Sequence, residues 1–317
     1  MNNPTTKIVH VRDLREPHES RRSLARGALQ GDQIRVARGA YVEAAAHALL
    51  SQRERYLLRI RAVAESRRSR PVVSHWSAAA IHNLPILGRW PDSVHLTIPP
   101  TSGGRSRGGV VKHSAPLAEF DVIEVNGMLV TSIARTVVDM AAALPFLGAV
   151  MMVDRALLVD RFGCIPPMTD RASLDGCWES MGSFRGFARA KSAIDFGEHR
   201  AESPLESVSR VSMRVIGSPR PILQAPHSDA EGFIGETDFF WPEFNAIGEA
   251  DGKSKYLEPS LRNGRTAEEA VVDEKTREDR LRAIPRAVAR WGWDVGINPA
   301  RLRPRLQRLG LPTGLLW

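Results

Sequence analysis

Short apolar stretches and basic residues alternate near the start of the chain, and this pattern predicts a small helix followed by two strands. We expect a helix from Ser20 to Arg26 and strands around Ile34–Arg38 and Tyr41–Val42. Arg38 and Gly39 are expected to form the turn, because glycine adopts backbone conformations that other residues avoid.

The middle of the chain changes between helical and strand-like spacing of its apolar residues. A charged segment from Ser51 to Arg70 carries Leu57, Leu58, Ile60, Ala62 and Val63 on an apolar side, which predicts an amphipathic helix. Beyond it we expect a strand, a helix capped by Ser74 or Ser77, strands at Val94–Ile98 and Val110–His113, and two helices between Thr131 and Asp160 that are separated near Leu144 and Pro145.

From Ser203 onward the pattern predicts the order helix, three strands, helix, strand. The first helix should bury Leu205, Val208, Val211 and Val215. Strands are expected at Phe233–Phe239 and Ala246–Gly252, with a turn from Trp241 to Asn245 between them.

These patterns together predict an α/β (α+β) multidomain protein, since 317 residues exceed what one hydrophobic core usually organises. We expect a DNA-binding segment that is similar to a winged helix at 1–45, an α/β domain at 46–160, a helical connector at 161–201 and a compact α/β domain at 202–317. The connector is expected to contain helical segments, with a helix at Phe184–Ile194 after them.

Positive charge is confined to the first part of the chain. Of the 44 Lys and Arg and 36 Asp and Glu, residues 1–195 hold 26 and 18, and residues 196–317 hold 18 and 18, so the whole excess of +8 precedes residue 196. Segregated positive charge is typical of a surface that binds nucleic acid, although an arginine-rich codon bias would give the same composition. The candidate DNA-binding residues are Arg21, Arg22, Arg26, Arg35, Arg38, Arg105 and Arg107.

The chain has only two cysteines, Cys164 and Cys177, which excludes a disulfide framework and a four-cysteine zinc site. The first residues contain no apolar stretch typical of a secretory signal, and the most apolar run, Val137–Val153, is too short and too interrupted to span a membrane. We therefore expect a cytoplasmic protein without a membrane partner.

The best candidate for chemistry is a group of carboxylates in the last part of the chain. A hairpin would bring Asp238 near Glu249, and Asp251 would share a face with Glu249 because strand side chains alternate. Carboxylate oxygens are the ligands that Mg²⁺ prefers. Glu206 follows Ser203 and Pro204 at the start of a helix, so it fits equally well a capping interaction and a place in the metal site.

The segment GETDFFWPEFNAIGEADGKSKY resembles the core of the PD-(D/E)XK endonuclease-like domains related to very-short-patch-repair endonucleases, and DEKTREDRLRAIPRAVARWGW continues the likeness. The resemblance covers about residues 202–297. It implies that Asp238 and Glu249 bind Mg²⁺ or Mn²⁺, that Glu206 is the helix acid and that Asp251 stands where the pattern has a lysine. Lys275, on the following helix, is the candidate to replace that lysine, and a surface pair with Asp279 is its alternative role.

Residues 20–160 resemble the AbiEi-type antitoxins of type IV toxin–antitoxin systems. The motifs are RVARGAYV, VVSHWSAAAIHNLPI, VHLTIPP and TSIARTVVDMA. The resemblance implies an operator-binding winged helix and a nucleotidyltransferase toxin as partner. His75, His82, His95 and His113 have no metal-ligand spacing, so we interpret them as core or surface residues.

The sequence thus predicts a DNA-binding protein with a magnesium-dependent endodeoxyribonuclease activity in its C-terminal domain. The alternative is a non-enzymatic transcriptional regulator or antitoxin whose nuclease-like fold is inactive. The oligomeric state is left open.

Overall fold

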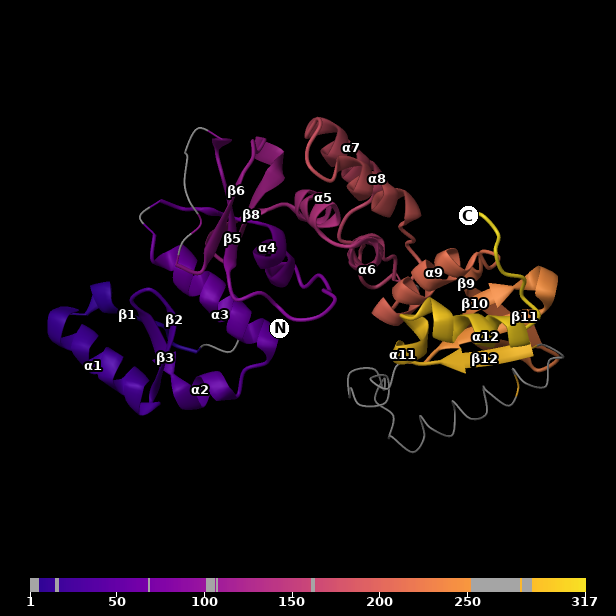
Figure 1. Cartoon of the computed structure of the whole chain (residues 1–317), viewed down its shortest axis with the longest axis horizontal. Helices are drawn as coiled ribbons and strands as arrows, with labels where there is room; N and C mark the ends of the chain where they lie inside the picture. The colour runs from indigo at the N-terminus through magenta and orange to yellow at the C-terminus, as the bar shows by residue number, and fades with distance from the viewer. Residues whose placement is uncertain are drawn as a thin grey trace. The chain divides into compact units, whose positions relative to one another are not determined.

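The computed structural model describes residues 6–14, 17–67, 69–100, 106, 108–160, 163–251, 280 and 287–317. As predicted, the protein is mixed α and β with more than one compact unit (Figure 1). The first unit comprises 1–145 and 169–195, and the second comprises 146–168 and 196–317. No helix within the described ranges is both long enough and apolar enough to cross a bilayer.

The first unit begins with a three-stranded antiparallel sheet in the order β1-β3-β2. Its strands are β1 (Val9–His10), β2 (Gln33–Ala37) and β3 (Ala40–Glu43), and it is accompanied by α1 (Pro17–Gln30), α2 (Ala44–Ala48) and α3 (Gln52–Glu65). The predicted helix and hairpin are confirmed, and α1 is longer than expected at both ends. Gly39 adopts φ +72° in the turn between β2 and β3, a region that suits glycine.

Helix α3 packs against two hydrophobic clusters with two different faces. Tyr56, Ile60 and Val63 belong to the core of the larger sheet, whereas Leu58 and Ala62 belong to the core of the small sheet. Residues three or four positions apart share one face of a helix, so each set forms its own stripe. The helix therefore joins the small sheet to the rest of the first unit.

The larger sheet of the first unit has the order β6-β5-β4-β8-β7. It consists of β4 (Val72–Val73), β5 (Val94–Ile98), β6 (Val110–Ser114), β7 (Val122–Val125) and β8 (Met128–Thr131), with α4 (His75–Ile81) and α5 (Ile133–Ala143) following β4 and β8. The β7–β8 hairpin was not predicted. Its turn residues Asn126 and Gly127 both have positive φ, as a tight Asn-Gly hairpin turn requires, so the dipeptide itself was the missed signal.

The predicted break near Pro145 is confirmed, because α5 ends at Ala143 and α6 (Phe146–Leu157) begins directly after it. The segment 161–201, expected to be one connector, contains both α7 (Arg171–Ser180) and α8 (Phe187–Phe196). Helix α7 packs on α5 in the first unit, whereas α6 packs on α9 in the second.

The second unit contains a four-stranded sheet in the order β12-β11-β10-β9. Its elements are α9 (Pro204–Ile216), β9 (Ile222–Asp229), β10 (Gly232–Trp241), the short 3-10 helix η4 (Pro242–Phe244), β11 (Ala246–Ala250), β12 (Ala287–Trp291), α11 (Trp293–Gly296) and α12 (Pro299–Arg308). The three predicted strands and the last strand are confirmed, and β12 runs parallel to β11. The helix expected between them lies outside the described residues.

The core of the second unit lies between α9, α12 and the sheet, and it includes Phe239, Trp241 and Trp291. Gly248 is required there, because a Cβ atom at this position would lie 2.5 Å from the ring of Trp291. The predicted burial of Val215 is wrong, since its exposed fraction is 65%. In the last turn of α9 only one side meets the core, and that side carries Met213 and Ile216.

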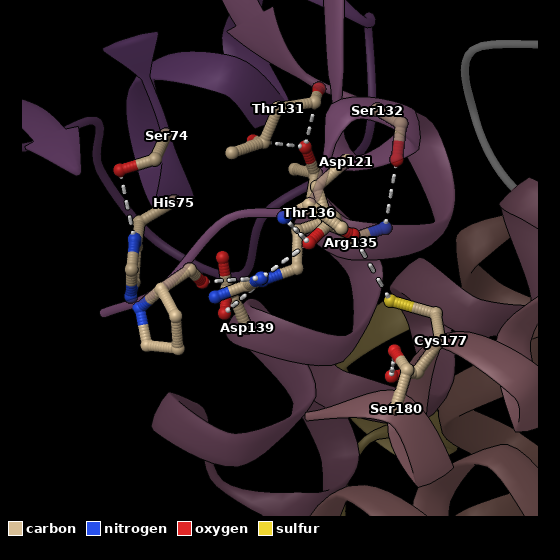
Figure 2. Close-up of polar contacts among 12 residues, drawn as sticks. Ser74, His75, Asp121, Thr131, Ser132, Arg135, Thr136, Asp139, Cys177 and Ser180 are labelled. Carbon is tan, nitrogen blue, oxygen red and sulfur yellow. Dashed lines mark hydrogen bonds and ion pairs between the residues drawn. The ribbon is translucent and has the colours of Figure 1, made fainter. Parts of the chain in front are cut away.

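A fully buried arginine of the first unit binds two carboxylates at once (Figure 2). Arg135 of α5 contacts Asp121 Oδ2 through Nη1 at 2.8 Å and donates from Nε to Asp139 Oδ1 at 3.1 Å. Nη1 also donates to the carbonyl of Pro116, and the Cys177 thiol of α7 lies 4.0 Å from Asp121 Oδ1. The network thus links the segment before β7 to α5 and α7.

Asp139 shares Arg135 with a second carboxylate, which leaves the buried group with a net negative charge. Burial raises the pKa of Asp139 to about 6, and this outweighs the opposing effect of Arg135; the charge of Asp121 adds to the rise. The Oδ2 atom of Asp139 is buried and has no hydrogen-bond partner in the described structure. Asp139 is therefore more easily protonated in the folded state than in the unfolded chain.

We predict that Asp139→Asn changes how stability depends on pH. A carboxyl whose pKa is higher in the folded state contributes stability that is complete below its unfolded pKa and is lost as the pH rises through its folded pKa. Relative to wild type, the Asn variant should therefore gain free energy of unfolding between about pH 4 and pH 7, by up to about 3 kcal/mol for a shift of about two pKa units. Chemical denaturation across this range measures the gain. A pH-independent difference, or an equal gain in the exposed-site control Asp32→Asn, would contradict the prediction.

Candidate functional site

The predicted carboxylates of the second unit lie where β10 and β11 stop pairing. The antiparallel register runs from Trp241 opposite Ala246 to Phe239 opposite Gly248, so Asp238 comes next to Glu249 across the strands. At that point Asp238 Oδ2 accepts the backbone N–H of Ala250 at 2.6 Å. Asp238 and Glu249 are both buried. The structure thus brings these two candidate metal ligands together.

Glu206 is fully buried at the start of α9, and its carboxylate forms the helix cap considered from sequence. Ser203 caps the helix by accepting the N–H of Glu206, and its hydroxyl donates to Glu206 Oε1 at 2.7 Å. Glu206 Oε2 accepts the backbone N–H of Glu202 at 3.0 Å. It also accepts an N–H from Gln224, which ties the helix acid to the sheet.

Gln224 is a site residue that the sequence analysis missed. Its side-chain amide donates to Glu206 Oε2 at 3.0 Å and reaches Asp238 Oδ1 at 3.4 Å, so it bridges the two carboxylates. Its φ is +48°, a conformation that is strained for a residue with a side chain. Strained residues cluster at functional sites. No feature of the surrounding sequence signals this conformation.

The Glu206–Asp238 pair has no cationic side chain beside it among the described residues. Burial, together with the nearby charge of Asp238, raises the pKa of Glu206 to about 8. Within the described part of the chain, neither carboxylate forms an ion pair with Lys or Arg. Two buried carboxylates without a cation are costly to ionise together.

Arg290 places a guanidinium beside the position where the nuclease pattern has a lysine. It is the register partner of Glu249 on the parallel strand β12, and its Nη1 lies 3.8 Å from Asp251 Oδ2. Arg290 could not be placed beside this position from the sequence, because β11 and β12 are paired but lie far apart in the chain. Lys275, the candidate replacement, lies outside the described residues.

The donor set suits a hard divalent cation. No group of three or more His, Cys, Asp or Glu side chains in the described structure is arranged to hold a metal ion. Mg²⁺, however, is usually held by one or two protein carboxylates and completes its shell with water and substrate phosphates. Asp238 and Glu249 fit this minimal arrangement as a pair.

Only some of the predicted DNA-binding arginines line a common pocket. Arg21 of α1, Arg35 of β2 and Arg38 of the β2–β3 turn line one pocket of 550 Å³, together with Arg12, which the sequence analysis did not select. Arg26 lines a separate pocket of 350 Å³. Arg22 is exposed on α1 and lines neither of these two pockets, and Arg105 and Arg107 lie outside the described residues.

The arginines of the 550 Å³ pocket, which we call the arginine pocket, are largely unneutralised. Arg21 and Arg38 make no hydrogen bond or ion pair with any described residue, and Arg35 only donates weakly to the carbonyl of Ala37 at 3.4 Å. Arg12 pairs with its neighbour Asp13. A concave surface with this excess of guanidinium groups attracts anions.

Three of the four histidines considered in the sequence, His75, His95 and His113, contact one another beside the larger sheet. The ring of His75 stacks on that of His113 at 3.4 Å between centroids, and His113 Nε2 is 2.9 Å from His95 Nδ1. Burial lowers the pKa of all three, so they are neutral near neutral pH. His82 is separate and contacts the carbonyl of Thr131. The stack is an uncharged packing element.

Comparison with known proteins gives relatives but no function. The chain is 28% identical over 192 residues to an uncharacterized protein of Mycobacterium tuberculosis strain H37Rv, and one from strain CDC 1551 matches equally well. The match covers 58% of this chain and 62% of each relative, so it spans less than two thirds of their length. No protein-family model matches the chain.

We predict that Glu206→Gln makes the second unit less sensitive to alkaline pH. The pKa of Glu206 is raised from 4.5 to about 8, so its contribution to stability is complete below about pH 4.5 and is lost as the pH rises through about 8. The amide keeps the hydrogen-bonding shape but cannot ionise. Thermal melting between about pH 5 and pH 9 should show the variant gaining on wild type as the pH rises. Glu243→Gln, at an exposed site of the same unit, is the control and should leave the difference flat.

Proposed function

We propose that this protein binds DNA through its first unit and that its second unit hydrolyses phosphodiester bonds with a divalent cation. The observation that carries the proposal is that Asp238 of β10 lies across from Glu249 of β11 and is bridged by Gln224 to Glu206 of α9, at the point where the strands separate. The Glu206–Asp238 pair lacks an arginine or lysine partner among the described residues, and a metal ion would supply the missing positive charge.

Each residue has a role that follows from its position. Asp238 and Glu249 would hold Mg²⁺ or Mn²⁺, which activates water and neutralises charge on the phosphodiester. Glu206 and Gln224 orient Asp238, because the amide of Gln224 bridges the two carboxylates. Arg290 would provide a positive charge beside Asp251, where the nuclease pattern has a lysine.

The order of elements in the second unit supports this proposal. A helix, three antiparallel strands and a further strand parallel to the third are compatible with a PD-(D/E)XK-like domain. In the first unit, α1 and the β2–β3 hairpin carry the arginine pocket, as a winged-helix-like segment that contacts phosphates would. A cytoplasmic location fits both activities.

A second candidate is a non-enzymatic transcriptional regulator or antitoxin that pairs with a nucleotidyltransferase-type toxin. The observation in its favour is Asp251, which adds negative charge where an active nuclease of this pattern has a lysine. In this candidate the carboxylate site is a structural remnant, and only the arginine pocket serves function.

We predict that the full-length protein nicks plasmid or single-stranded DNA in the presence of Mg²⁺ or Mn²⁺ and that Asp238→Asn or Glu249→Gln lowers the rate at least about 100-fold, as expected when a transition-state interaction is lost. Chelator should abolish cleavage, and the exposed-site variant Glu243→Gln should cut normally. Wild-type protein that binds DNA but does not cut with either metal would reject the nuclease proposal and leave the regulator.

We also predict that Arg21→Gln combined with Arg38→Gln weakens duplex DNA binding and flattens its salt dependence. Each lost phosphate contact should lower the slope of log K against log salt by about 0.9, so the double variant should lose about 2. Fluorescence anisotropy at several salt concentrations measures the slope. Arg200→Gln with Arg301→Gln removes the same charge from exposed sites in the second unit. An equal loss in that control would show that net charge, not the arginine pocket, determines binding.

A further inference from the structure

A smaller pocket of 220 Å³ in the first unit has a different chemical character from the arginine pocket. Its walls come from β2, α3 and the loop before β5, and its distinctive residues are Val36, Arg55, Tyr56, Arg59, Arg89 and Trp90. It therefore combines an apolar strand, two aromatic rings and three guanidinium groups around one small hollow.

The aromatic wall is held rigidly. The rings of Tyr56 and Trp90 stack at 5.6 Å with an angle of 22° between their planes. The Tyr56 hydroxyl lies 2.7 Å from Ser77 Oγ and donates to the carbonyl of Ser93 at 2.9 Å. Tyr56 is buried and Trp90 only half-buried, so the indole lies at the boundary between the core and the pocket.

Two of the three arginines are fixed by the protein, and the third is left for a ligand. Arg55 donates to the carbonyls of His47 and Ala48, and Arg59 contacts Asp92. Arg89 is exposed and has no hydrogen bond or ion pair with any described residue. Asp92 is the acidic residue among the lining residues, so positive charge prevails in the pocket. Burial and the charges of Arg55 and Arg59 lower the pKa of His47, which keeps that lining side chain neutral.

We propose that this pocket binds one phosphorylated nucleotide unit, with the base against Trp90 and Val36 and the phosphate on Arg89. Bases stack on aromatic side chains whatever their identity, and arginine forks match phosphate oxygens. The volume is below the roughly 300–1,000 Å³ of pockets for drug-sized ligands, so the hollow itself takes up only a small group. The same chemistry is present in a free nucleoside monophosphate and in one nucleotide of a single strand.

This site is separate from the proposed DNA contact. Successive side chains of a strand point to opposite faces, and on β2 Ile34 and Val36 line the nucleotide pocket whereas Arg35 lines the arginine pocket. A variant of one pocket therefore leaves the walls of the other intact, and the two proposals can fail independently.

The experiment measures binding of nucleoside monophosphates to the full-length protein by calorimetry and tryptophan fluorescence. Adenosine and inorganic phosphate, each tested alone, are the ligand controls. We expect the monophosphate to bind at least about tenfold more tightly than either half. Arg89→Gln should weaken it about tenfold, because a charge-assisted phosphate contact is lost. Arg200→Gln, which removes an exposed arginine elsewhere, should leave the affinity unchanged.

Trp90→Leu tests the base side and should weaken the monophosphate while leaving the weak binding of phosphate unchanged. Arg89→Gln alone decides the matter if the Trp90 variant does not fold, since Arg89 has no described partner to lose. A short oligothymidylate shows whether the bound nucleotide is a free monophosphate or part of a single strand. It is tested in a variant that also carries Arg21→Gln and Arg38→Gln, so that the oligonucleotide does not bind at the arginine pocket. Binding by the oligonucleotide alone, lost with Arg89→Gln, identifies a strand nucleotide. No binding by any of these ligands, equal binding of phosphate and monophosphate, or indifference to Arg89→Gln would overturn the proposal.

Discussion

A guanidinium group that is removed from water must be neutralised where it lies, and each compact unit is built around one such group. In the first unit Arg135 lies between Asp121 and Asp139, and in the second Arg210 contacts Asp154 at 2.8 Å. Arg210 and Asp154 join elements 56 residues apart in the chain, whereas Arg135 pairs within α5 and with a segment 14 residues before it. Removing one partner of a buried pair costs about 3–5 kcal/mol, because the other charge stays buried and unpaired. Each pair therefore fixes the helix that carries its arginine, α5 in the first unit and α9 in the second.

Against this background the Glu206–Asp238 pair is unusual. The buried carboxylates Asp121 and Asp154 each have an arginine, whereas Glu206 and Asp238 share only the amide of Gln224 in the described structure. No arginine or lysine among the described residues pairs with Glu206 or Asp238, although arginines pair with the buried carboxylates Asp121 and Asp154. Both carboxylates accept hydrogen bonds from neutral groups but have no cation, and a buried carboxylate whose pKa is raised, as that of Glu206 is, is common at functional sites.

The basic first unit shows how one short strand separates two kinds of positive surface. Because side chains alternate along β2, Arg35 lines the wide arginine pocket and Val36 lines a small pocket with an aromatic wall. The first surface suits an extended polyanion, and the second suits a single planar ligand with a phosphate. Helix α3 contributes to both hydrophobic cores beneath this region, so the two pockets share one rigid support.

The sequence by itself determined the mixed α and β class, most strands, the break at Pro145 and the pairing that brings Asp238 to Glu249, because these follow from apolar periodicity and short-range turns. It also confined the excess charge to the first 195 residues. It could not show that α6 packs on α9 while α7 packs on α5, that Val215 is exposed, or that Asn126 and Gly127 join an additional hairpin whose strands are only four residues long. Nor could it identify Gln224, Arg290, Arg12 or the stacking of His75 on His113. Those features depend on contacts between segments far apart in the chain, and only packing of the complete tertiary structure decides which distant side chains share a buried space.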